Sequence, residues 1–155
     1  MRLAKCRIRK AVPRDAERLT EVAHAAKRHW KYPARWIRLW QDELTVSPRF
    51  ISTHAVYCAV RGGKLAGFYA LSRHAANFEL EHLWVPPAHI GSGVGTRLFA
   101  HALARIRAAG GTTLEIASDP NAQGFYRRMG ARPVGFVPSR PRGRRLPLLV
   151  IDVQR

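Results

Sequence analysis

Three glycines at alternate positions, Gly91, Gly93 and Gly95, have the types and spacing that point most directly to chemistry. They follow an apolar run that ends at Val85 and two prolines, and a helical pattern begins directly after them. The first backbone N–H groups of a helix lack intrahelical partners, and the helix dipole makes that end partly positive. Because glycine has no Cβ, the main chain can also approach a phosphate closely. The order of strand, glycine-rich turn and helix therefore predicts a site for a phosphate-bearing ligand.

The spacing of these glycines restricts the kind of ligand. A P-loop needs a lysine directly after its last glycine, and none is present here. A dinucleotide fingerprint needs G-x-G-x-x-G near the start of a βαβ unit, whereas these glycines read G-x-G-x-G in mid-chain. Taken alone, the turn is also compatible with a flexible loop before a helix or with another kind of nucleotide-binding module.

A second motif, SDPNAQGFYRRMGARPVGF at 118–136, narrows these alternatives. Together the two segments resemble the GNAT superfamily of acetyl-CoA-dependent N-acetyltransferases. The phosphate loop of that family, Q/R-x-x-G-x-G/A, falls on 90–95, with Ile90 in place of the usual Gln or Arg. This departure affects a side-chain contact but not the backbone cradle. The resemblance extends from about Ile8 to the end of the chain, and it is strong over 79–136. The later family motif falls on Asn121, Phe125, Tyr126, Gly130 and Ala131.

The resemblance implies that acetyl-CoA is the co-substrate and that the strand at 78–85 binds its pantetheine arm through the backbone of Leu83 and Val85. Asn121 is expected to hydrogen-bond the pantetheine amides, or alternatively to serve only as a residue at the start of a helix. The full set of residues expected to bind acetyl-CoA is Leu83, Val85, Ile90, Gly91, Ser92, Gly93, Val94, Gly95, Thr96, Asn121 and Phe125.

Two carboxylates, Glu79 and Glu81, lie on the strand at 78–85. Side chains alternate along a strand, so both are expected to share one face with Leu83 and Val85. Two carboxylates on a dry face would be costly, so this face must meet water, a cation or a substrate amine. The resemblance implies that one of them is the catalytic base, and Glu81 is favoured because it lies nearer the glycine turn. The alternative is a carboxylate that simply pairs with one of the many arginines.

The resemblance also implies a direct reaction in a ternary complex, in which a primary amine attacks the acetyl thioester. An alkyl ammonium has a pKa near 10.4 and a glutamate about 4.3, so the base is expected to be desolvated or to act through ordered water. Tyr126 is expected to donate a hydrogen bond to the leaving thiolate. The alternative for Tyr126 is an aromatic side chain that only packs against the helix beneath it.

Aromatic residues near the N-terminus are the candidates for binding the amine acceptor, and they are His29, Trp30 and Tyr32. Aromatic faces can hold a cation. Trp36 and Trp40 lie on one face of a predicted helix and are equally consistent with core packing. The residues do not separate a small amine, an amino acid, an antibiotic or a protein amine as the acceptor, and they leave open whether the chain forms a homodimer.

The formal net charge of +17 has three interpretations. Clustered Lys and Arg bind nucleic acid, a positive field attracts a polyanionic cofactor, and arginines also occupy ordinary solvated surfaces. A basic cluster near the C-terminus has no interleaved aromatic residues, which argues against a dedicated nucleic-acid module. The alternative function is a nucleic-acid- or ribosome-associated protein that uses the same fold for binding without turnover. The basic cluster comprises Arg140, Arg142, Arg144 and Arg145.

The composition, 46% hydrophobic over 155 residues, predicts one folded domain over residues 1–155. No apolar run approaches the ~20 residues of a membrane span, and no apolar stretch typical of a signal peptide follows the basic N-terminus, so a cytoplasmic location is expected. Cys6 and Cys58 are expected to be reduced, and the histidines show no spacing typical of a metal site.

Hydrophobic periodicity predicts a mixed α/β (α+β) fold, with a central sheet and helices on both faces. The resemblance implies the same fold class and a sheet that is mostly antiparallel. A loop is expected after residue 43, around Ser47-Pro48. Strands are predicted over 6–11, 55–60, 65–72, 78–85, 113–117, 132–137 and 146–153, and helices over 13–31, 34–43, 93–108 and 120–129.

Overall fold

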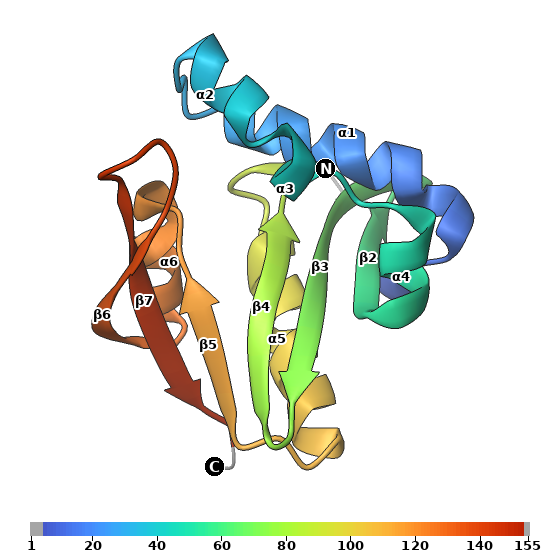
Figure 1. Cartoon of the computed structure of the whole chain (residues 1–155). Helices are drawn as coiled ribbons and strands as arrows, with labels where there is room; N and C mark the ends of the chain where they lie inside the picture. Colours follow the sequence, from blue (N-terminus) through green and yellow to red (C-terminus); the bar gives the residue numbers. More distant parts are fainter. Residues whose placement is uncertain (1–4, 154–155) are drawn as a thin grey trace.

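The computed structural model describes residues 5–153, which form one seven-stranded sheet in the order β1-β2-β3-β4-β5-β7-β6 (Figure 1). Only the β4–β5 pair is parallel among the neighbouring pairs, and all the others are antiparallel. The predicted fold class is thereby confirmed. The strands are β1 (Cys6–Lys10), β2 (Ala55–Arg61), β3 (Lys64–His74), β4 (Asn77–Trp84), β5 (Thr113–Ala117), β6 (Arg132–Pro138) and β7 (Arg145–Asp152).

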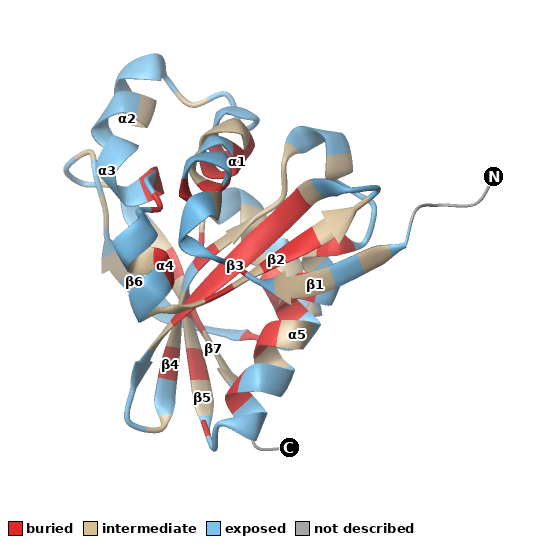
Figure 2. Ribbon diagram, turned by 90° about the vertical axis from the view of Figure 1, so that its right-hand side faces the viewer, coloured by how far each residue is buried: buried red, intermediate tan, exposed pale blue. Residues whose placement is uncertain are grey.

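Helices cover both faces of the sheet. One core lies between the sheet and α5 and α6, and includes Leu98 and Phe99. The other lies under α1, α3 and α4, where Leu19 and Val22 come from the apolar stripe of α1. Figure 2 shows the buried residues concentrated along β2 and β3, between the two helical layers. The helices are α1 (Ala16–Arg28), α2 (Ala34–Leu39), α3 (Gln41–Leu44), α4 (Pro48–Thr53), α5 (Val94–Ala108) and α6 (Gln123–Arg128), with short 3-10 turns η1 (Pro13–Asp15), η2 (Pro87–His89) and η3 (Pro120–Ala122).

Two parts of the helical prediction are wrong. The expected helix over 34–43 is broken into α2 and α3, and the expected loop around Ser47-Pro48 contains α4. The Ser47 hydroxyl accepts the N–H of Phe50 at 3.0 Å, and Pro48 occupies the first helical position. Serine followed by proline is a helix-start signal, so α4 was visible in the sequence.

A β-bulge in β4 overturns the expected alternation of its side chains. Ala70 of β3 faces His82, but the next β3 residue faces Leu80, so Glu81 has no partner across the ladder. The extra residue shifts the pleat by one position. Leu80 and Leu83 therefore both pack toward the α5 core, and the prediction that Glu79, Glu81, Leu83 and Val85 share one face is wrong.

The parallel strands β4 and β5 separate soon after they meet. Their pairing runs from Asn77 opposite Thr113 only as far as Glu79 opposite Glu115. Figure 1 shows the two strands diverging beyond this point. No strand of the described chain pairs with this edge of β4 beyond Glu79, so its backbone groups there are left for another partner.

Gly67 of β3 fits where a larger residue does not. Its φ is +152°, and an added Cβ would lie 2.8 Å from the carbonyl oxygen of Trp84 in β4. We predict that Gly67→Ala lowers the free energy of unfolding by about 2 kcal/mol, because the clash involves backbone. Gly124→Ala is the control, since its Cβ would meet only the end of Arg128 at 3.4 Å. That variant should be neutral or stabilised by up to about 1 kcal/mol. Urea denaturation checks both values, and equal stabilities would contradict the analysis.

Candidate active site

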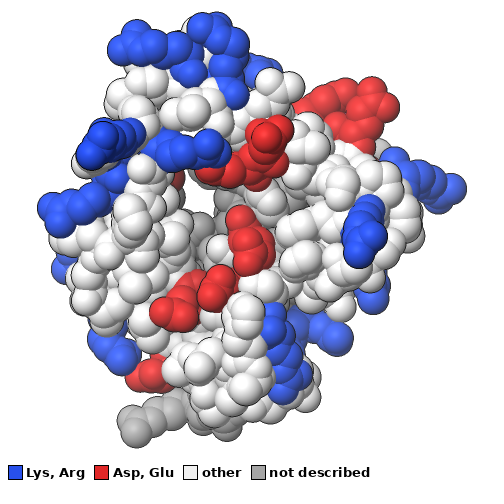
Figure 3. All heavy atoms as spheres, in the orientation of Figure 1, with Lys and Arg blue, Asp and Glu red and all other residues white. Residues whose placement is uncertain are grey.

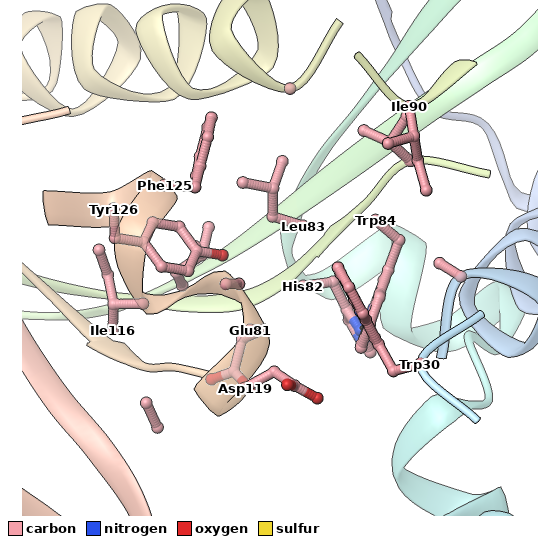
Figure 4. A pocket seen from close by; sticks show the side chains of 16 residues that line it. Trp30, Glu81, His82, Leu83, Trp84, Ile90, Ile116, Asp119, Phe125 and Tyr126 are labelled. Atoms are coloured by element: carbon pink, nitrogen blue, oxygen red, sulfur yellow. The ribbon is translucent and has the colours of Figure 1, made fainter. Parts of the chain in front are cut away.

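A cavity of about 220 Å³ opens where β4 and β5 separate (Figure 4). Its walls come from the end of β4, the start of α5, and α6, through Leu83, Val85, Gly95, Phe125 and Tyr126. The sequence motifs that lie far apart in the chain are therefore brought together around one space. Four of these residues were expected to bind acetyl-CoA, and one was expected to be catalytic.

The Tyr126 side chain supplies the buried polar group of this cavity. It is 6% exposed, and its hydroxyl has no hydrogen-bond partner among the described residues. No fully enclosed side-chain oxygen or nitrogen of the described chain lacks a partner, so the hydroxyl must face open space. Figure 4 shows it pointing into the cavity, on the side of Glu81. Burial raises the pKa of Tyr126, so the phenol is neutral and available as a donor.

Glu81 lies at the bulge of β4, where three adjoining cavities meet. It lines the main cavity and two neighbours of about 160 and 340 Å³. Its carboxylate is exposed and accepts a hydrogen bond from the Ser72 hydroxyl at 2.6 Å. Glu79 lines only the 340 Å³ cavity and not the main cavity. Of the two carboxylates named from the sequence, only Glu81 therefore shares a cavity with Tyr126.

The glycine turn has the backbone geometry of an anion cradle. Gly91 and Gly93 have φ values of +78° and +87°, which favour glycine, and Gly93 begins α5 without a side-chain cap. A depression of about 260 Å³ runs along Ser92, Gly93 and Val94. Ile90 and Gly95 instead line the main cavity, and Thr96 is exposed on the first turn of α5.

Three basic residues surround this turn and were missed by sequence reasoning. Lys5, Arg61 and Arg97 line the same depression as Gly93. They come from the segment before β1, the end of β2, and α5, so no local motif joins them. A concentration of positive charge at an uncapped helix start fits a phosphate group.

A buried ion pair borders the site, since Asp119 lines the main cavity and both residues of the pair line the 160 Å³ cavity. Lys27 Nζ of α1 lies 2.5 Å from a carboxylate oxygen of Asp119, and both side chains are 9% exposed. Burial, the largest single influence, would raise the pKa of Asp119, but the hydrogen bond and charge of Lys27 together with the hydrogen bonds from the Asn121 backbone and Tyr32 hold that pKa below its usual range. Burial lowers the pKa of Lys27. The pair therefore joins α1 to the segment that leads into α6.

Asn121 and Tyr32 belong to this network and not to the main cavity. The Tyr32 hydroxyl lies 3.1 Å from both carboxylate oxygens of Asp119 and accepts a hydrogen bond from Asn121 Nδ2 at 3.1 Å. Neither residue is part of the cavity wall. Asp119 also accepts a hydrogen bond from the backbone N–H of Asn121. Asn121 therefore lies at the start of a helix, which is the second of the two roles predicted for it from the sequence.

The aromatic cluster already holds cations of the chain itself. The Lys27 ammonium lies 4.5 Å from the ring centre of Trp40, and the Arg144 guanidinium lies 4.6 Å from it. Trp40 is 2% exposed and packs edge-on against Trp36. Of the three expected acceptor-binding residues, only Trp30 lines the main cavity. His29 is exposed beside the Trp30 ring, and Tyr32 belongs to the ion-pair network.

His82 is a polar residue of the site that sequence reasoning placed on a strand without giving it a role. It is 8% exposed and lines both the main cavity and the 160 Å³ cavity. Its Nδ1 accepts the indole N–H of Trp84 at 2.9 Å, and burial lowers its pKa to about 4. The neutral ring therefore carries its proton on Nε2. This nitrogen has no partner in the described chain and so faces the cavities.

The basic cluster near the C-terminus is largely engaged within the fold. Arg140 pairs with Glu43 at 2.6 Å, Arg144 stacks on Trp40, and Arg145 lies 4.8 Å from the Phe136 ring centre. These partners favour a structural use of the cluster over a free nucleic-acid surface.

Several other expectations concern groups outside the cavity. Cys6 and Cys58 are both free thiols. Within residues 5–153, no group of three or more His, Cys, Asp or Glu is arranged to hold a metal ion. No helix in the same range combines the length and apolar character needed to span a membrane.

Comparisons with known proteins agree with this geometry. The sequence profile of the acetyltransferase (GNAT) family matches residues 17–131. The chain is 34% identical to blasticidin-S acetyltransferase of Streptomyces morookaense over 107 residues, which cover 68% of this chain and 79% of that protein. It is 46% identical to streptothricin acetyltransferase of Streptomyces lavendulae over 74 residues, which cover 44% of this chain and 39% of that one. The fold matches PaiA N-acetyltransferase of Thermoplasma acidophilum in complex with coenzyme A, with a TM-score of 0.80 at 18% identity over 96% of this chain and 99% of the other.

The buried His82 predicts a specific dependence of stability on pH. Its pKa is about 4 in the folded chain against a usual 6.5, so the unfolded chain binds the extra proton between these values. The free energy of unfolding should therefore rise with pH from about 4 to about 6.5, by up to about 3 kcal/mol from this group, and then level off. In His82→Gln the amide oxygen can still accept the Trp84 N–H, and this part of the slope should vanish. Urea denaturation across this pH range measures the slope, and an unchanged slope in the variant would contradict the assignment.

Proposed function

We propose, since the chain belongs to the acetyltransferase (GNAT) family, that this N-acetyltransferase transfers an acetyl group from acetyl-CoA to a primary amine by direct attack in a ternary complex. One observation carries the proposal. The Tyr126 hydroxyl, which has no hydrogen-bond partner within residues 5–153, and the carboxylate of Glu81 border one cavity, which also reaches the start of α5.

The residues around the glycine turn fit coenzyme A. The uncapped first turn of α5 offers backbone N–H groups, and Lys5, Arg61 and Arg97 add positive charge for a polyanionic ligand. The separation of β4 from β5 leaves the backbone at Leu83 and Val85 for the amides of a pantetheine arm. Phe125 and Ile90 supply apolar walls beside that backbone.

Acetyl-CoA supplies the activated acyl group as a thioester. Tyr126 donates a hydrogen bond to the sulfur atom as the C–S bond breaks. A phenol is a weaker acid than a thiol, by about 1.5 pKa units at their usual values, so full proton transfer to the sulfur is uphill. The raised pKa of Tyr126 strengthens this argument, and its role is that of a fixed hydrogen-bond donor.

Glu81 accepts the proton that the amine must lose. An alkyl ammonium has a pKa near 10.4, so only about 0.1% of a free amine is neutral near pH 7.5. Because Glu81 is exposed and not desolvated, its carboxylate removes the proton through one ordered water as the new C–N bond forms. Glu81 is preferred to Glu79 because only Glu81 lines the cavity that contains Tyr126.

The acceptor that we propose is an amine of a small molecule. The two curated relatives are named for blasticidin-S and streptothricin, which supports an antibiotic or a similar compound over a protein amine. The adjoining cavities of about 160 and 340 Å³ offer room for a compact molecule beside Glu81.

The first test uses purified protein, acetyl-CoA and a panel of primary amines, with release of free thiol as the measurement. We predict that Tyr126→Phe lowers kcat by about 100-fold and changes the Kd for coenzyme A less than threefold, since only the donor to the sulfur is lost. Gly93→Val should show the opposite pattern and weaken coenzyme A binding, because valine is strained at φ +87°. Wild-type kinetics in both variants would contradict the assignment of Tyr126 and Gly93 to the active site. Salt-dependent nucleic-acid binding without any thiol release would support the non-catalytic alternative.

A higher pH should restore the activity that is lost when the catalytic base is removed. We predict that Glu81→Gln lowers kcat/KM about 100-fold near pH 7.5, and that the deficit shrinks steadily toward pH 10 as the free amine becomes abundant. The pH–rate profile of thiol release measures this. A larger loss in Glu79→Gln than in Glu81→Gln would transfer the role to Glu79.

A further inference from the structure

The 160 Å³ cavity beside Glu81 is bordered by charges of both signs. It lies between α1, the end of β4 and the turn at 139–144 that joins β6 to β7. Figure 3 shows both acidic and basic side chains at the rim of the hollow on one face of the molecule. The partners of these charged groups decide which of them are left for a ligand. The charged residues that line this cavity are Lys27, Glu43, Glu81, Asp119 and Arg144.

Most of these charges are already compensated within the fold. Lys27 pairs with Asp119, and Glu43 pairs with Arg140. Glu81 forms no ion pair with a residue of the described chain, and its carboxylate is engaged only by a hydroxyl group. The negative charge of Glu81 is therefore left for the amine of the acceptor, as the proposed reaction requires.

Arg144 is the cation of this cavity that the fold positions but does not neutralise. Its guanidinium lies 4.6 Å from the ring centre of Trp40 and donates hydrogen bonds to the hydroxyls of Ser139 at 3.1 Å and Tyr32 at 3.2 Å. It forms no ion pair with an Asp or Glu among residues 5–153. A guanidinium has more N–H donors than these two bonds use, and its planar form suits a carboxylate.

The charge of Arg144 also acts on its surroundings. Burial lowers the pKa of Lys27, and the nearby charge of Arg144 lowers it further. The carboxylate of Asp119 is already taken by Lys27, so it does not serve both cations equally. A carboxylate brought by a ligand would therefore be the counterion that Arg144 lacks.

The His82 ring is a second, independent sign of a ligand in this cavity. It is 8% exposed and lines the 160 Å³ cavity together with Arg144, as well as the main cavity. Its Nδ1 accepts a hydrogen bond from Trp84, so its proton is on Nε2, which has no partner among residues 5–153. Polar groups this deeply buried are normally hydrogen-bonded. His82 and Arg144 thus offer N–H donors to one cavity, and such a pair of donors fits a carboxylate.

We infer that the acceptor is amino-acid-like, with its amine at Glu81 and a carboxylate of the same molecule bound by Arg144 and His82. This inference rests on the proposed function and names the class of its substrate. One molecule that carries both charges matches the two unpaired charges of the cavity, whereas a simple amine would leave Arg144 without a counterion. An amino acid, or a larger compound that carries an amine and a carboxylate close together, has this chemistry.

Binding in the presence of saturating coenzyme A tests the inference without requiring turnover. Calorimetry compares glycine, β-alanine, 4-aminobutanoate and 5-aminopentanoate, each with its own amide, which keeps the amine and removes the negative charge. At least one acid should bind about tenfold more tightly than its amide, which corresponds to ~1.4 kcal/mol. The preference should fall as ionic strength is raised, because partly exposed charges are screened. If no acid binds more tightly than its amide, the inference is overturned.

Matched variants of the turn between β6 and β7 locate the carboxylate. The preference should fall to less than threefold in Arg144→Gln and to an intermediate value in Arg144→Lys, which keeps the charge without the planar set of N–H groups. Arg142→Gln removes the same charge from an exposed position of the same turn that lines none of the three cavities, and it should keep the full preference. A full preference in either Arg144 variant would overturn the inference, so Arg144→Lys decides the case if Arg144→Gln does not fold.

Thiol release in the same samples separates the two proposals. Arg144-dependent binding of an acid without acetyl transfer would contradict the proposed function and support the inference. Transfer to acids and amides alike, with equal affinity, would support the function and overturn the inference.

Discussion

The early separation of β4 from β5 is the constraint on which the site depends. Within residues 5–153 the two strands are the only parallel pair, and their ladder ends at Glu79 and Glu115. A strand edge within a sheet would normally be paired, so the edge of β4 beyond this point must find other partners. The bulge at Glu81 occurs just beyond the last pair and sends Leu83 toward the α5 side. The cavity, the unpaired backbone edge of β4 and the exposed Glu81 carboxylate therefore all follow from the separation of β4 from β5.

The buried Lys27–Asp119 pair joins two distant parts of the chain at the wall of this opening. The two residues lie 92 positions apart in the chain and join α1 to the segment before α6. Each charge is buried, so neither is tolerable without the other, and the loss of one partner of such a pair costs about 3–5 kcal/mol. Tyr32 and Trp40 pack around the ammonium, so the aromatic residues that resemble a substrate cage stabilise the wall of the site instead.

The sequence predicted those parts of the site that depend on short, local motifs. The glycine turn, the helix after it and the Tyr126 segment depend on spacings within short stretches. The structure brings Ile90, Gly95 and the Tyr126 segment around one cavity, while Ser92 and Gly93 line a separate depression. The bulge at Glu81 was out of reach because it is a property of pairing with β3, and β4 alone reads as a regular strand. The same holds for Lys5 and Arg61, which meet the turn only through the fold. The start of α4 is different, since its Ser-Pro signal was present and was read as a loop.

The positions of the charged residues explain ligand binding better than the net charge of the chain does. The net charge of +17 describes the chain as a whole, yet five of its ten acidic residues line the cavities of the site, and the basic residues Lys5, Arg61 and Arg97 border the start of α5. At physiological ionic strength, fields between exposed charges fade over about 8 Å, so each region acts mainly on a ligand that lies beside it. A polyanionic cofactor is attracted to one region and the ammonium group of the acceptor to the other. In the reaction that we propose, the two ligands meet at one cavity, and the different local charges keep each from occupying the place of the other.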